Sequence, residues 1–196
     1  GYLYASGTGK LTRNPARAFI WYQRAAQGGL AAAQNEVGVM ANRGDGVARD
    51  DALAAQWYRR AAEQGLAVAA RNLGTLYDRG EGVAQDRVQA LFWYLKAAEQ
   101  DDPELHNRIG TLYDVGDGTP PDPREAARWY QRASDREHPG ARRNLARLHE
   151  LGRGRELDLD KARRLYKEAA DAGDVPAARQ LGQLLRRGSE DDRGRA

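Results

Sequence analysis

Residues 69–100 read AARNLGTLYDRGEGVAQDRVQALFWYLKAAEQ, and this stretch decides the fold of the 196-residue chain. An alanine-rich apolar segment runs up to a Gly-x-Gly turn at residues 80–82, where glycine can adopt the positive φ that ends a helix. A second segment follows Asp86, whose carboxylate can accept from the unpaired N–H groups of a first helical turn. We therefore expect a helix, a glycine turn and a second helix that carries Trp93.

The same unit recurs along the chain with a period of 36 residues. Tryptophan marks the period at four positions and leucine at a fifth, and each is followed by tyrosine: Trp21, Trp57, Trp93, Trp129 and Leu165. One helix pair cannot bury its apolar faces alone, so neighbouring pairs must stack. The strict register also favours a core role for the tryptophans over a ligand cage. The sequence predicts an all-α solenoid of about five 36-residue helix-turn-helix repeats.

Helix ends recur at the same register as the tryptophans. Each second helix is expected to start at a side-chain cap, at Asn14, Asp50, Asp86, Asp122 and Asp158. The turns at residues 44–46 and 116–118 read Gly-Asp-Gly, but they lack the alternating acidic ligands and terminal Glu of a calcium loop. No Gly-Lys-Ser/Thr follows them, as a phosphate loop would require. We interpret these turns as helix ends and expect no metal and no cofactor.

The periodic residues resemble the SEL-one-like repeat (SLR) family, which is related to the tetratricopeptide repeat. The clearest unit carries Ala69, Leu73-Gly74, Tyr77, Gly80-x-Gly82-Val83, Asp86, Ala90, Trp93-Tyr94 and Ala97-Ala98. The resemblance covers about residues 4–188 and implies a right-handed α-solenoid whose first helices line the concave surface. We expect one array over residues 1–188, as a fragment or mature part of a longer chain, and a polar, disordered tail over residues 189–196.

Composition excludes several classes of protein. The net charge is +3 with 30% charged residues, well mixed along the chain, so the electrostatic pattern of a nucleic-acid-binding protein is missing. There is no cysteine, which excludes disulfides and thiolate metal sites. No apolar run approaches the ~18 residues of a membrane span. We expect a location in the periplasm or cell envelope, with the cytoplasm left open.

Residues with catalytic potential are few and scattered. None of the three histidines, His106, His138 and His149, has a second His or a Cys at the spacing of a helical metal-ligand pair. Ser134 and His138 are four residues apart, but no third group is evident to orient the histidine. We expect no catalytic residue and no enzymatic activity. The alternative is an enzyme acting on cell-wall peptides or β-lactams, as proposed for cysteine-rich relatives in the resembled family, whose cysteines this chain lacks.

Polar residues on the side of the first helices opposite the core form the first candidate binding surface. At 100° per residue, three tracks face away from Val37 and its equivalents. The candidate partner-binding residues are Asn35, Arg71, Thr75, Asp78, Asn107, Thr111, Asp114, Arg143, Arg147 and Arg179. The arginines gather toward the C-terminal end and would suit carboxylates on a partner. A solvated face with internal ion pairs is the alternative interpretation.

An apolar stripe on one second helix is the other candidate surface. Val88, Phe92 and Leu95 stand at i, i+4 and i+7, in columns held elsewhere largely by Gln, Arg and Lys. We call these three residues the outer stripe. It predicts a contact with a partner or a second copy, and packing against a neighbouring helix is the competing interpretation.

The leading functional hypothesis is a bacterial adaptor or scaffold that holds a protein or peptide partner on its concave face. The family resemblance also implies a more specific version, an inhibitor or immunity protein that neutralises a secreted toxin. The partner's identity and the oligomeric state are left open by the sequence.

Overall fold

The computed structural model describes the backbone of residues 2–6 and 13–194, and the side chains of residues 2, 4–6 and 13–187. Within this part of the chain every regular element is an α-helix and there is no strand, which confirms the predicted all-α class. The helices are α1 Tyr2–Ser6, α2 Pro15–Gln27, α3 Ala31–Arg43, α4 Asp51–Glu63, α5 Ala67–Arg79, α6 Arg87–Ala97, α7 Pro103–Val115, α8 Pro123–Asp135, α9 Pro139–Leu151, α10 Leu159–Asp171 and α11 Val175–Gly194.

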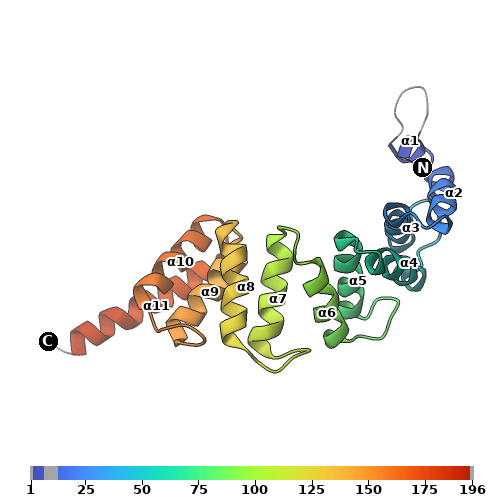
Figure 1. Ribbon diagram of the computed structural model, residues 1–196. Coiled ribbons are helices and arrows are strands. Elements are labelled where there is room, and N and C mark those ends of the chain that lie inside the picture. Colours follow the sequence, from blue (N-terminus) through green and yellow to red (C-terminus); the bar gives the residue numbers. More distant parts are fainter. Residues whose placement is uncertain (1, 7–12, 195–196) are drawn as a thin grey trace. The chain divides into compact units, whose positions relative to one another are not determined.

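The helices form two compact units, which Figure 1 colours from blue to green and from yellow-green to red. The first unit, residues 1–100, holds α1 to α6, and the second, residues 101–196, holds α7 to α11. Within each unit every helix packs against the next one along the chain. The odd-numbered helices are the first helices of the repeats and the even-numbered ones are the second helices. The single array predicted over residues 1–188 stays a prediction.

Side-chain caps start every second helix, as predicted. The cap oxygens accept from a backbone N–H in the first turn at 2.8–3.0 Å, at Asn14, Asp50, Asp86, Asp122 and Asp158. The first helices α3, α5, α7 and α9 each end at a glycine with φ between +61° and +81°. A residue with a side chain is strained in that conformation, so glycine ends the helix at little cost.

The core of each repeat lies between its two helices. A first-helix glycine faces the ring of the second-helix tyrosine in three pairs, Gly38 with Tyr58, Gly74 with Tyr94 and Gly110 with Tyr130. Trp57, Trp93 and Trp129 are 4–8% exposed, which confirms their predicted core role. Trp21, on α2, is 48% exposed, so the predicted core role does not extend to the first tryptophan.

The C-terminal segment differs from the predicted disordered tail. Helix α11 continues through Gly194, so the backbone of residues 189–194 is helical. A helix that begins in a packed repeat can propagate through polar residues, because each added residue gains a backbone hydrogen bond. Residues 195–196 lie outside the described residues.

Candidate protein-binding surface

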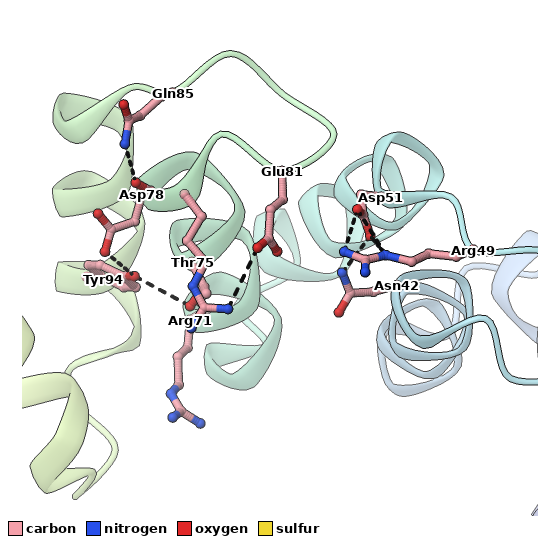
Figure 2. A network of polar contacts seen from close by, with 10 residues as sticks. Asn42, Arg49, Asp51, Arg71, Thr75, Asp78, Glu81, Gln85 and Tyr94 are labelled. Carbon is pink, nitrogen blue, oxygen red and sulfur yellow. Dashed lines mark hydrogen bonds and ion pairs between the residues drawn. The ribbon is translucent and has the colours of Figure 1, made fainter.

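A buried carboxylate in the third repeat shows how the polar residues of the first helices are used. Asp78, on α5, accepts a 3.2 Å hydrogen bond from the Tyr94 hydroxyl and lies 2.9 Å from Nε of Arg87 (Figure 2 shows the Asp78–Tyr94 contact). Its backbone carbonyl also accepts from Gln85 at 2.8 Å. Asp78 is 8% exposed. The sequence places it on the open face, whereas the structure places its carboxylate inside the repeat, where α6 satisfies it.

The second-helix tyrosine takes part in polar contacts in other repeats too. Tyr166 donates to the Glu150 carboxylate at 2.7 Å, and the hydroxyl of Tyr130 lies 3.4 Å from that of Thr111. Burial raises the pKa of Tyr130 and of Tyr58 to about 12, because the charged phenolate is poorly solvated there. Burial and then the Glu150 carboxylate raise the pKa of Tyr166. The tyrosine column therefore combines core packing with a polar link to the first helix.

Asp114, one repeat after Asp78, is held by the next repeat instead of its own. The position of Arg87 is taken there by Pro123, which has no charge to offer. Arg147 on α9 pairs with Asp114, and Arg153 in the following turn lies 3.3 Å from its carboxylate. The Asp114 side chain is 2% exposed, while the two arginines are 40% and 45% exposed. This carboxylate fastens the fifth repeat onto the fourth.

Amide pairs join successive first helices inside each unit. Asn72 donates to the side-chain oxygen of Asn35 at 3.1 Å, and Asn144 donates to that of Asn107 at 3.0 Å. The donor and acceptor positions are 37 residues apart in both pairs, one position more than the repeat period. Asn35 is buried, so this predicted binding residue is used in packing between repeats.

The predicted threonines are also committed to local contacts. The hydroxyls of Thr75 and Thr111 donate to backbone carbonyls one turn earlier, those of Arg71 and Asn107, at 3.0 Å. Both threonines are half-buried, as is Arg71. Such back-bonding is the usual way in which a mid-helix threonine satisfies its hydroxyl.

The predicted arginines fall into two groups. Arg143 binds both carboxylate oxygens of Asp174 at 2.7–2.9 Å, and Asp174 in turn caps α11 by accepting from the Ala177 N–H at 2.8 Å. Arg147 is held by Asp114. Arg179, on α11, is exposed and makes no side-chain hydrogen bond or ion pair within the described residues. The internal ion pairs foreseen as the alternative are thus present at Arg143 and Arg147.

The outer stripe on α6 lies at the surface. Val88, Phe92 and Leu95 are 62%, 46% and 38% exposed. Phe92 packs edge-on against the ring of Trp93 at a centroid distance of 5.0 Å, and the Lys96 ammonium lies 4.6 Å from the Phe92 centroid. The stripe is therefore an apolar surface feature within the first unit, and the competing interpretation of a stripe buried against a neighbouring helix does not hold for these three side chains.

His106, His149 and Ser134 are buried, whereas His138 makes polar contacts at a helix start. His106 lies 5.4 Å from the Trp129 ring, and both it and His149 are 5% exposed. Burial lowers the pKa of His149, because the charged imidazolium is poorly solvated. Ser134 is buried, and His138 contacts Glu104 and the Ala141 N–H. Among the described residues, no group of three or more His, Cys, Asp or Glu side chains is arranged to hold a metal ion.

The sequence did not reveal the side chains that bind the polar residues of the first helices and so decide which of them are accessible to a protein partner. The tyrosine hydroxyls, Arg153 and the contact between Glu104 and His138 were not identified. A signal for one of them exists in the aligned repeats, where Pro123 stands at the position of Arg87, the arginine that pairs with the equivalent carboxylate Asp78. The other contacts depend on side-chain reach between repeats.

The chain consists of helix pairs joined by glycine turns, and many polar side chains of its first helices are engaged in intramolecular contacts. These features define a class of protein, an all-helical repeat scaffold. A model of the Sel1 repeat matches residues 1–30, 31–66, 67–102, 103–138 and 139–174. The chain therefore belongs to the Sel1 repeat family, and the predicted resemblance to SLR proteins is confirmed. No curated protein matches the chain in sequence.

Solved structures agree with this assignment. An SLR-fold protective antigen present in uropathogenic Escherichia coli strains is 35% identical, with a TM-score of 0.86 over 95% of this chain and 40% of that one. A Sel1 repeat protein from Oxalobacter formigenes is 34% identical, with a TM-score of 0.83 over 94% of this chain and 76% of that one. A putative Sel1 repeat protein from Klebsiella pneumoniae, 19% identical with a TM-score of 0.52 over 94% and 90%, shares the fold alone. This chain spans less than half the length of the E. coli protein.

Within the described residues, no helix combines the length and apolar character needed to cross a bilayer.

Proposed function

We propose that this Sel1-repeat scaffold holds a protein or peptide partner on the first-helix face of its second unit, centred on Arg143, Arg147 and Arg179. Sel1 repeats generally mediate protein interactions, which supports this class of function. The proposal concerns α9 and α11, two first helices that lie in the same unit.

The exposure and the ion pairs of the three arginines support the proposal. Arg143 and Arg147 are 27% and 40% exposed while held by buried carboxylates, so their guanidinium groups are positioned before any partner arrives. Arg179 is exposed and has no intramolecular partner among the described residues. A pre-ordered donor loses less conformational entropy on binding, and guanidinium groups bind carboxylates bidentately. The expected partner surface is therefore acidic.

Charge reversal at Arg179 is the sharpest test, because it leaves the internal ion pairs intact. Reversal at Arg143 or Arg147 would expose Asp174 or Asp114 to repulsion and unfold the unit, which would confuse binding with folding. Arg164 on α10 is an exposed arginine on a second helix, so Arg164→Glu gives the same change in net charge on a different surface.

The experiment captures partners from the source organism with the tagged chain and identifies them by mass spectrometry. Recovery of the same protein is then compared for Arg179→Glu and Arg164→Glu. We expect Arg179→Glu to reduce recovery at least fivefold, as loss of a charge-assisted hydrogen bond does, and Arg164→Glu to leave it unchanged. Equal recovery with both variants would reject this face as the binding surface.

A more specific form of the proposal is an inhibitor or immunity protein acting on a secreted toxin in the periplasm or cell envelope. The captured protein then carries toxic activity that the purified chain neutralises at a one-to-one ratio. Fractionation of the source cells tests the location. A captured protein with no toxic activity would reject the immunity role and would be compatible with the scaffold role.

The outer stripe is a second surface that we propose for protein contact. Its exposed apolar side chains favour it, since burying Phe92 removes a large apolar area from water. Phe92→Glu should weaken binding of the captured partner or shift self-association seen by sedimentation. If neither changes, the stripe has no binding role.

A further inference from the structure

Each first helix in the second unit starts at a side-chain cap, and one of these caps is a histidine. The residues at this register are Asp102, His138 and Asp174, whereas the first unit has Leu30 and Leu66, which make no side-chain cap. At the start of α9, Nδ1 of His138 accepts the Ala141 N–H at 3.0 Å. The other ring nitrogen, Nε2, lies 2.9 Å from a carboxylate oxygen of Glu104 on α7.

These two contacts fix the protonation state of the ring. Nδ1 can accept a backbone N–H only with its lone pair free, so the single proton of the neutral imidazole sits on Nε2 and is donated to Glu104. An imidazolium carries a proton on both nitrogens and can no longer accept from Ala141. Protonation therefore abolishes the cap, whereas the Asp residues at the same register keep theirs until their carboxylates are protonated.

The charges around the ring do not offset this loss. Glu104 attracts a protonated ring, but its side chain is 70% exposed and the attraction is screened by water. The positive end of α9 repels an imidazolium placed at its N-terminus. In the turn before the ring, Arg136 is paired with Asp101. Arg142, one turn into α9, lies 3.7 Å from Glu137 and also 3.7 Å from Glu168, which is on α10.

We propose that His138 is a pH-sensitive cap, which fastens the first turn of α9 to α7 when neutral and releases that turn when protonated. The ring also packs against Gly140, where a Cβ would stand 3.2 Å from Cε1 of His138 and 3.7 Å from the side-chain nitrogen of Asn107. Release of the cap consequently loosens the junction that the Asn107–Asn144 pair bridges. This device is independent of which partner the scaffold binds.

The test measures the ring and the capped amide directly by NMR. Nitrogen chemical shifts of the His138 ring in the unaltered protein at pH 8 should show the proton on Nε2. Amide hydrogen exchange of Ala141, corrected for intrinsic rates, should lose about fivefold in protection as the ring is protonated, which corresponds to one N-cap. His138→Asp supplies the matched control, because aspartate already caps α7 and α11 at this register.

Each outcome decides the proposal. Protection of Ala141 that falls in the unaltered protein between pH 8 and pH 5.5 but holds in His138→Asp supports it. Glu104→Gln should move the fall to lower pH, because it removes the carboxylate that favours the protonated ring. A proton found on Nδ1 at pH 8, or the same loss of protection in His138→Asp, would overturn the proposal. The ring measurement needs only the unaltered protein, so it stands whether or not the variants fold.

Discussion

The ring of Tyr94 lies against the bare backbone of Gly74, so closely that a Cβ on Gly74 would stand 2.6 Å from Cδ1 of the tyrosine. The same contact recurs in the second and fourth repeats. Gly74→Ala must therefore push the buried ring aside. We expect a loss of up to about 2 kcal/mol in the free energy of unfolding, because an overpacking cost of about 1–3 kcal/mol is offset only in part by the gain of about 1 kcal/mol in helix propensity. Urea denaturation followed by circular dichroism measures it.

Gly182 provides the matched control for Gly74. It occupies the same column on α11, but a Cβ there would have no neighbour within 4 Å. Gly182→Ala should therefore gain up to about 1 kcal/mol from helix propensity alone. Equal effects of the two substitutions would show that the Tyr94 ring yields freely. In the fifth repeat the corresponding residues are Tyr166 and Ala146, so an alanine is already accommodated in that column.

Asp114→Asn should destabilise the second unit by about 1–3 kcal/mol, because the buried carboxylate holds two arginines from the next repeat. Arg147→Ala and Arg153→Ala should each cost less than Asp114→Asn, because one arginine remains in place. Chemical denaturation of the single and double variants measures the coupling. The exposed pair of Asp160 and Arg163 is the control, and Asp160→Asn should change stability by less than about 0.5 kcal/mol. Equal losses at Asp114 and Asp160 would contradict the structural role of the buried carboxylate.

Glu137→Gly should stabilise the protein by about 1 kcal/mol. Glu137 has a φ of +62°, where the same register holds Gly29, Gly65 and Gly173 with φ of +89° to +91°. A residue with a Cβ is destabilised by about 1–2 kcal/mol in this conformation, so replacing it with glycine relieves that strain. The greater freedom of glycine in the unfolded chain offsets part of the gain in stability. Thermal unfolding followed by circular dichroism tests the change. Gly65→Glu should shift the midpoint in the opposite direction, and an unchanged midpoint in both variants would refute the strain.

Alkaline pH should unfold the protein through its buried tyrosines. The pKa of Tyr130 is about 12 in the folded protein against an ordinary value of 10.0, so the folded state disfavours the phenolate. The stability that this difference contributes is complete below pH 10 and is lost as the pH rises toward 12. Tyrosinate absorbance and circular dichroism, recorded together, should change in one transition within this range.

Tyr130→Phe separates ionisation from packing, since phenylalanine keeps the ring and cannot lose a proton. The variant should unfold at a higher pH than the unaltered protein. An identical alkaline midpoint would show that Tyr130 does not set the transition.

The sequence by itself determined the repeat and its local geometry. The spacing of Trp57 and Trp93, the aspartate caps and the glycine turns each act within one helix pair, so their physics is local and readable from a period of 36 residues. All of these predictions hold in the structure. The apolar stripe that contains Phe92 was also visible in the alignment of the repeats, but whether it faces outward or packs against a neighbouring helix was left open until the structure showed it exposed.

Tertiary structure alone decided which polar residues of the first helices are open to a partner. Asp78, Asp114 and Asn35 look alike in the helical pattern, yet all three are buried, because each meets a side chain from another helix. Helical periodicity gives the direction in which a side chain leaves its own helix, but not whether a neighbour reaches it. Arg179 meets no acceptor among the described residues, and the packing of the helices, not the helical pattern, decides this.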